Sequence, residues 1–241
     1  MGIITTKAIV MSAIKYSDTS LIVKLYTKES GLVTYLLKGI LNSKKGKLRT
    51  AYFQPLLQLS IIYNHLEKRN LQIINEAKVI HLYHTIHNSF IKQSIVLFLS
   101  EILTSAIREE ENNSFLYNYL ETSFIWFDSN HQISNFHLLF LLNLTKFLGF
   151  YPDLSDSHKE GFHLREGIFT EDLQDKYIIR EFELIQFKKL LGINFDEIRD
   201  ISFSKTERQR LLQILIRYFQ LHLDGFKIPK SLAVLETVFS K

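Results

Sequence analysis

The spacing of apolar residues changes near residue 80, and this change constrains the fold more than any other feature. From Thr5 to Lys78, apolar and polar residues alternate in runs rich in Ile, Val, Leu, Tyr and Thr, which is typical of half-buried strands. Beyond residue 80, apolar residues recur every three or four positions, as they do in amphipathic helices. The sequence therefore predicts a β-rich domain of residues 1–80 and a helical domain of residues 81–241.

The first domain is expected to hold five strands separated by turn-forming sequences. A single long connection follows the third strand. Five short strands arranged in this way resemble a small closed barrel of the OB type, although local propensity does not separate it from an SH3-like barrel. The expected strands lie near residues 5–16, 20–27, 31–39, 53–64 and 71–79.

The second domain is expected to be a helical bundle, which makes the whole chain an α+β protein. Gly149, Gly192 and Gly225 stand where helices would end, because glycine favours the position after a helix terminus. A polar, charged stretch of about residues 151–180 is either a small subdomain or an irregular excursion. The expected helices lie at residues 86–110, 113–128, 133–149, 181–191, 206–223 and 231–240.

Positive charge is concentrated in the first domain. Residues 1–80 carry 12 Lys and Arg against 4 Asp and Glu, whereas the remaining residues carry 17 against 21. The segment 38–49 holds five cations and two glycines and no carboxylate. A basic loop on a basic module suits a polyanion, so we expect the first domain to bind nucleic acid.

The alternation of side chains along a β-strand indicates which residues are expected to contact nucleic acid. Lys24 and Tyr26 share one face of a predicted strand, and we expect this pair to face outward as a cation beside a stacking platform. Tyr35 and Phe53, by contrast, are expected to fill the interior of the barrel. The predicted DNA-binding residues are Lys24, Tyr26, Lys38, Lys44, Lys45, Lys47 and Arg49.

Several classes of function find no support in the sequence. There is no cysteine, which excludes disulfides and thiolate chemistry and fits a reducing cytoplasm. No apolar stretch is long enough for a membrane span, and no signal peptide is recognisable. Neither a glycine-rich phosphate loop nor a spaced set of catalytic carboxylates is present. We therefore expect a soluble cytoplasmic protein that is not an enzyme and needs no cofactor.

The order of several motifs resembles the bacterial RecO family of recombination mediators. The first half of that family shows a turn after an extended segment, then a Thr-x-x-x-Gly step, and then a Lys-Gly that opens a basic loop. Two further motifs occur far along the helical half, and the shared order covers nearly the whole chain. Here the motifs stand at residues 16–20, 26–31, 38–49, 53–55, 140–154 and 230–235.

This resemblance implies a mediator of DNA repair and homologous recombination. Such a protein binds single- and double-stranded DNA, anneals complementary strands, works with RecR, and helps load the recombinase onto strands coated by single-stranded DNA-binding protein. It also implies an apolar pocket with a basic edge for the acidic C-terminal tail of that coating protein. Arg108 and Lys146, on helices that could face one another, are the candidate basic residues.

One departure from the family pattern concerns zinc. Many members carry a Cys-x-x-Cys-Gly after the Pro-Asp-Leu step and a second cysteine pair downstream. The first pair falls here at about Ser157 and Glu160, so zinc bound through thiolates is ruled out. His158 and His163 with an acidic neighbour are a conceivable set, but four ligands in a fixed frame are needed. We expect no metal.

Two other functions remain open from the sequence. One is an RNA-binding or ribosome-associated OB protein whose helical half is a scaffold. The other is a metal-dependent nuclease that uses the acidic residues of segment 153–172. A comparison of binding to DNA and RNA, together with binding to the coating protein's tail, separates the mediator from the RNA-binding protein.

Overall fold

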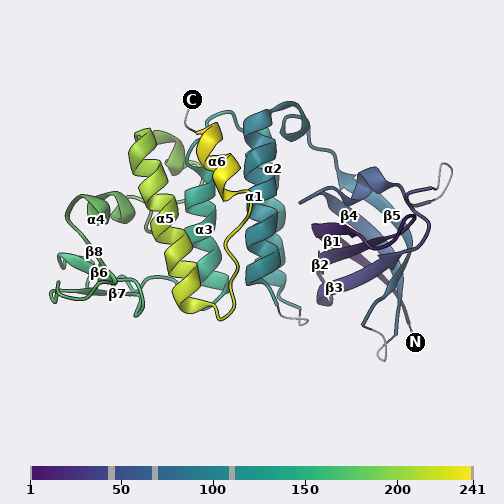
Figure 1. The fold of residues 1–241 in the computed structure, drawn as a ribbon, viewed down its shortest axis with the longest axis horizontal. Helices are drawn as coiled ribbons and strands as arrows, with labels where there is room; N and C mark the ends of the chain where they lie inside the picture. The colour runs from purple at the N-terminus through teal and green to yellow at the C-terminus, as the bar shows by residue number, and fades with distance from the viewer. Residues whose placement is uncertain (1, 43–46, 67–69, 109–111, 240–241) are drawn as a thin grey trace. The chain divides into compact units, whose positions relative to one another are not determined.

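A computed structural model describes residues 2–42, 47–66, 70–108 and 112–239. The contacts between residues divide the chain into two compact units. Unit 1 consists of Met1–Ser129 with Pro229–Ser231, and unit 2 consists of Asn130–Ile228 with Leu232–Lys241. Figure 1 shows the strands and helices of each unit. None of the described helices is long and apolar enough to cross a membrane.

Unit 1 is built on a five-stranded antiparallel sheet in the order β3-β2-β1-β4-β5. A parallel bridge between Tyr35 of β3 and Gln72, just before β5, brings the two edges together. The N–H of Leu36 donates to Gln72 O at 2.9 Å, and the N–H of Gln72 donates to Thr34 O at 2.9 Å. The strands are β1 (Gly2–Lys15), β2 (Leu21–Thr27), β3 (Gly31–Leu37), β4 (Gln58–His65) and β5 (Ile73–His81).

This sheet confirms the predicted OB-like fold, although it is a curved sheet with a bridged edge and not a fully closed barrel. Alternation accounts for the strand positions, because Val23, Leu25 and Tyr35 are buried while their chain neighbours Ile22, Lys24 and Thr34 are half-buried. The fourth strand begins later than predicted. Residues Thr50–Phe53 form a short 3-10 helix, η1, and Leu56 and Leu57 are buried before β4 begins.

Two helices pack on this sheet within the same unit. They are α1 (Phe90–Ala106) and α2 (Ser114–Ser129). The Lys7 Nζ of β1 lies 2.9 Å from the Glu121 carboxylate of α2, and Gln58 Nε2 donates to Glu121 O at 3.0 Å. The hydroxyl of Thr104 in α1 donates to Met11 O at 3.2 Å. The compact unit therefore extends past the boundary expected near residue 80, because α1 and α2 cover part of the sheet.

A hydrogen-bonded network joins the segment after β5 to the end of α2. Asp128 accepts from the N–H groups of His84, Thr85 and Ile86 at 2.8, 2.8 and 3.0 Å. Burial alone raises the pKa of Asp128, but these donors outweigh it and the net shift is downward. The buried Lys92 ammonium donates to Asp128 O at 2.9 Å, which neutralises charge where α2 ends.

Unit 2 combines helices with a second, small antiparallel sheet in the order β7-β6-β8. The segment 151–180 was expected to be either a small subdomain or an irregular excursion, and it contains this sheet. Figure 1 shows the sheet beside α4 and α5. The elements of unit 2 are α3 (Phe136–Phe147), β6 (Gly161–His163), β7 (Ile168–Thr170), β8 (Ile178–Arg180), α4 (Glu181–Lys188), the short 3-10 helix η3 (Glu197–Asp200), α5 (Lys205–His222) and α6 (Leu232–Val238). Another short 3-10 helix, η2 (Ile86–Asn88), belongs to unit 1.

Candidate nucleic-acid interface

The exposed side of β1, β2 and β3 is the first part of the candidate interface. Beyond a bulge in β1, Lys24 pairs with Ser12 on one side and with Thr34 on the other. Ile22 forms the neighbouring pairs with β1 and β3, and residues paired across antiparallel strands project to the same side. We call this set the β1–β3 outer face: Ser12, Ile14, Ile22, Lys24, Thr34 and Leu36.

Lys24 lies in the middle of this face and is half-buried. Its paired neighbours Ser12 and Thr34 are polar, whereas the other members of the face are apolar, and Ile14 among them is 62% exposed. A cation beside both hydroxyl groups and apolar side chains suits a ligand that alternates charge with flat apolar surface, as a nucleic-acid strand does. Contact between Lys24 and DNA stays a prediction.

The predicted outward orientation of Tyr26 is wrong. Its side chain is only 1% exposed, and its ring stacks on Tyr117 of α2 with 6.4 Å between centroids. The hydroxyl donates to Asn113 O at 3.5 Å. Tyr26 does share strand parity with Lys24, but α2 covers the sheet at this end of β2. A buried ring leaves no face for a base, so we remove Tyr26 from the candidate interface.

Tyr16 is an accessible aromatic residue at one end of the sheet that our prediction did not select. It follows β1 in the turn to β2 and is 62% exposed. Its N–H donates to Ser20 O at 3.0 Å, which fixes the backbone of the turn. The sequence signal is its place beside Lys15 in a tight turn, where a side chain finds little to pack against. Tyr16 can therefore offer a ring to a base beside the outer face.

The β1–β2 turn is tied to the start of the basic loop. The N–H of Gly39 donates to Ser20 Oγ at 3.3 Å, and the N–H of Leu41 donates to Thr19 O at 3.0 Å. Gly39 has a φ of +68°, a conformation that glycine adopts without strain. These bonds bring the exposed Lys38 to the same end of the sheet as the turn that carries Tyr16.

Lys44 and Lys45 lie outside the described residues, so the structure gives no account of them. Lys47 is 73% exposed and forms an ion pair with Glu76 of β5. The hydrogen bond and charge of Lys47 lower the pKa of the Glu76 carboxyl. Because the pair is exposed it is weak, but a phosphate that binds Lys47 has to compete with Glu76.

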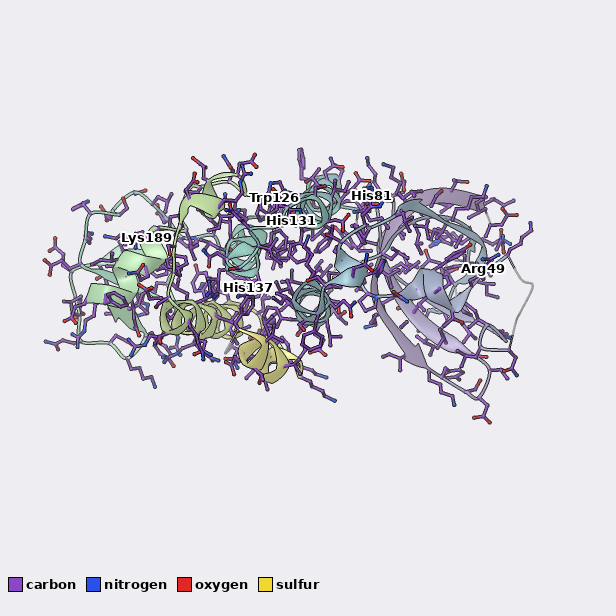
Figure 2. The ribbon with its side chains drawn as sticks, turned by 90° about the horizontal axis from the view of Figure 1, so that it is seen from above. Arg49, His81, Trp126, His131, His137 and Lys189 are labelled. Atoms are coloured by element: carbon purple, nitrogen blue, oxygen red, sulfur yellow. The ribbon has the colours of Figure 1, made fainter. Side chains whose placement is uncertain are left out.

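Arg49 is exposed and stands immediately before η1. Figure 2 labels it on the connection between β3 and β4. Lys24, Lys38, Lys47 and Arg49 therefore come from one strand and from the long connection of the same sheet. This arrangement offers several separate cations on one sheet and on its long connection. It suits a phosphate backbone better than a single small anion.

Arg108 and Lys146 were expected on two facing helices. The structure places Arg108 after the end of α1, exposed and outside any helix, in unit 1. Lys146 is in the last turn of α3, in unit 2. Its ammonium lies 4.6 Å from the centroid of the Tyr151 ring, and partial desolvation lowers the pKa of Lys146. The helical position predicted for Arg108 is wrong, because α1 ends at Ala106.

The two histidines considered for a metal site lie in different surroundings. His158 is exposed. His163 Nδ1 accepts from the N–H of Glu166 at 3.2 Å, and its Nε2 lies 3.7 Å from an Asp175 oxygen. Across the described ranges, no three His, Asp or Glu side chains come together as a potential metal site. The acidic residues of segment 153–172 therefore offer no assembled metal centre for a nuclease.

Two family descriptions match consecutive parts of the chain and together cover most of it. The family described as "Recombination protein O N terminal" matches residues 1–83, and the one described as "Recombination protein O C terminal" matches residues 87–232. The boundary between the two matches is close to the change in apolar spacing at residue 80.

Several curated proteins are similar over nearly their full length, and each carries the name "DNA repair protein RecO". The protein of Christiangramia forsetii is 46% identical over 237 residues, covering 98% of this chain and 99% of the relative. The protein of Flavobacterium psychrophilum is 47% identical with the same coverage. The protein of Bacteroides fragilis is 37% identical over 239 residues, covering 97% of this chain and 98% of the relative.

Proposed function

The chain belongs to the RecO family of DNA repair proteins, and we propose that it acts in repair by binding single- and double-stranded DNA. It anneals complementary strands and helps load a recombinase onto strands coated by single-stranded DNA-binding protein. Its contribution is to hold and present strands, with no bond made or broken by the chain itself.

The observation that carries this proposal is the tie between the β1–β2 turn and the start of the basic loop. The hydrogen bonds of Gly39 and Leu41 hold Lys38 and Tyr16 at the same end of the sheet. Lys24 on the outer face and Arg49 before η1 add charges on the same sheet. A nucleic-acid strand that binds along these groups finds cations for its phosphates and an aromatic ring for a base.

Binding through the backbone explains how annealing follows. Contacts of Lys and Arg with phosphates carry no sequence information, so any strand is bound. They also leave the hydrogen-bonding edges of the bases free for a complementary strand. Neutralising phosphates reduces the repulsion between the two backbones, which lowers the barrier to pairing.

The partners implied by the family are RecR and the acidic C-terminal tail of single-stranded DNA-binding protein. Arg108 of unit 1 and Lys146 of unit 2 remain the proposed contacts for carboxylates of that tail. Lys146 is the better candidate, because the ring of Tyr151 under its ammonium gives an apolar surface beside a charge.

A salt titration of binding to a short single strand tests the interface. The variant Lys24→Ala/Lys38→Ala/Arg49→Ala removes three cations of the candidate interface. We expect weaker binding to every sequence alike, and a slope of log affinity against log salt that falls by about 2, at about 0.7 per lost single-strand contact. The control Lys189→Ala/Lys205→Ala/Lys227→Ala removes three exposed cations of unit 2 and should leave the slope much less changed.

Two outcomes contradict this proposal. An unchanged slope in the first variant, with the fold intact by circular dichroism, removes the assigned interface. Tighter binding of RNA than of DNA of the same sequence, without any annealing of DNA, favours the RNA-binding alternative instead. Lys44→Ala/Lys45→Ala, measured in the same titration, tests the two loop lysines by themselves.

A further inference from the structure

Unit 2 contains a groove of about 500 Å³ that the proposed function does not use. It lies among β8, α4, α5 and α6, and its apolar lining includes Leu164, Ile178 and Ile214. Lys176, Arg210 and Arg217 contribute positive charge, and Glu183 and Glu236 contribute negative charge. The groove therefore combines an apolar floor with a charged rim.

The charges on the rim are unevenly neutralised. Glu183 lies 4.0 Å from Arg210, so these two form an ion pair. Glu236 accepts a hydrogen bond from Gln213 at 2.5 Å. Within the ranges that the structure describes, neither Lys176 nor Arg217 has a carboxylate within 4.0 Å. One end of the rim is therefore cationic, whereas the other end holds the Glu183–Arg210 ion pair and the carboxylate of Glu236.

The cationic end is organised around one aromatic ring. Arg165 lies 4.3 Å from the centroid of Tyr177, and Lys176 and Arg217 each lie 5.1 Å from it. Arg165 Nη2 also donates to the Tyr177 hydroxyl at 2.8 Å, and Arg217 Nη2 donates to Lys176 O at 3.3 Å. We call these four residues the Tyr177 cluster. The ring and the hydrogen bonds hold three cations close together.

Such a cluster favours an anion. Three like charges gathered around one ring repel one another, and the nearby carboxylate, Asp175, already interacts with the charge of Arg165 as well as with His163. It accepts the N–H of Tyr177 at 2.8 Å and lies 3.7 Å from His163 Nε2. An incoming anion relieves the repulsion and meets guanidinium groups that are already oriented, so little conformational entropy is lost on binding.

We propose that the groove and the Tyr177 cluster bind a nucleotide unit of a second nucleic-acid strand, with the phosphate at Lys176 and Arg217 and the base over the apolar floor. A nucleotide brings one charge, and its neutral base lies toward Glu183, Glu236 and Gln209, whose polar atoms match the donors and acceptors of base edges. An acidic peptide fits less well, because its several carboxylates would face Glu183 and Glu236 as well as the cations.

This inference rests on the proposed function and extends it. Unit 1 binds one strand and unit 2 binds another, so one chain raises the local concentration of each strand around the other. Annealing then depends on both units, whereas capture of a first strand depends on unit 1. The net negative charge of the residues after 80 conceals this local positive site.

The test compares annealing with binding in the full-length protein. The double variant Lys176→Glu/Arg217→Glu should slow annealing of complementary oligonucleotides by about tenfold or more, which is the size of effect expected when one phosphate contact is lost. Affinity for the first strand should change by less than about threefold, and the number of strands bound at saturation should fall from two to one per chain. A photoreactive oligonucleotide should crosslink to peptides that contain residues 165–177 or 210–217, and the double variant should lose these crosslinks.

Matched variants keep the test decisive. Lys205→Glu/Lys227→Glu makes the same change of charge on exposed residues of unit 2 outside the groove, and it should anneal like the unmodified protein. If the double reversal lowers the melting temperature, Lys176→Gln/Arg217→Gln replaces it, with a smaller loss in the same direction. If the folded variant at Lys176 and Arg217 anneals strands at the unmodified rate and still binds two strands per chain, the inference is overturned. A double variant that loses an oligoaspartate peptide but keeps both strands also overturns it. If the unmodified protein binds no strand at all, the proposed function itself fails.

Discussion

The two sheets of this protein are both antiparallel, yet they are stabilised in different ways. In unit 1, β1 alone spans 14 residues and pairs with both β2 and β4, so main-chain hydrogen bonds extend along a large surface. In unit 2, each of the three strands has three residues. So short a sheet is marginal by itself, and side-chain packing has to supply what the hydrogen bonds do not.

That packing is aromatic. Phe162 of β6 is fully buried, with its ring centroid 5.0 Å from those of Phe169 and Phe187 and 5.9 Å from that of Tyr218. Next to it, a Cβ on Gly161 would lie 2.7 Å from Leu173 Cδ2. A sheet this small can therefore be held by close packing of aromatic rings against helices α4 and α5, whereas the large sheet has an extended ladder of main-chain hydrogen bonds.

The largest expected effect comes from breaking the packing of the small sheet. Phe162→Ala should reduce the free energy of unfolding by roughly 3–5 kcal/mol, as buried Phe-to-Ala changes do, measured by chemical denaturation. Hydrogen exchange should show new exposure in unit 2 and unchanged protection in β1 and β4. The exposed Phe182 gives the control, since Phe182→Ala should cost little. Equal losses in the two variants would contradict the packing argument.

In unit 1 the matching change removes a buried hydrogen-bonding group. Asp128→Ala takes away the acceptor of three N–H groups and leaves them unsatisfied, at a cost of roughly 2–4 kcal/mol. Asp128→Asn keeps the shape and one acceptor oxygen, so it should cost less. The same denaturation experiment measures both variants. If the two variants lose the same free energy of unfolding, the acceptor oxygen kept in Asp128→Asn does not satisfy these N–H groups.

Acid should weaken unit 2 through a buried histidine. His137 of α3 is fully buried, and desolvation, together with the charge of Arg208, lowers its pKa to about 3. The folded-state pKa is below the unfolded value, so stability is complete above the unfolded pKa and falls as the pH drops from about 6.5 toward 3. The slope is about 1.4 kcal/mol per pH unit. His137→Phe should flatten it, and replacing the exposed His158 should not.

The smallest expected effect concerns the exposed ion pair at the basic loop. Glu76→Gln frees Lys47 for a phosphate, because the pair joins these two side chains. Affinity for a single strand should rise by about twofold, and the salt slope should steepen by up to about 0.7. Replacing Glu29, another acidic residue of unit 1, gives the comparison and should change the slope less. A lower affinity in Glu76→Gln would show that the pair positions the loop for binding.

The sequence predicted the large sheet well because its strands are long enough for alternation to be counted. It did not predict β6, β7 or β8, since three residues hold too few positions to show a period. It also misplaced Tyr26. Alternation gives the side of the strand correctly, but it does not say that α2, about 90 residues further along the chain, covers that side.

The candidate site was predictable in its charges and less so in its geometry. The run of cations in segment 38–49 identifies the loop, but the pairing of Lys47 with Glu76 depends on where β5 lies in the sheet. Tyr16 was not selected, because its exposure follows from turn geometry. The Tyr177 cluster joins residues of segment 165–177 to Arg217 of α5, and the net charge of the second half concealed it.

The contacts of Asp128 also change how the segment between sheet and helices should be regarded. Residues 84–86 join β5 to α1, in the position of a hinge between the sheet and the helices that follow it. Their three amide protons are bound to a carboxylate at the end of α2. They should therefore exchange with solvent about as slowly as those of the strands, and the bending that a connector allows should be absent at this point of the chain.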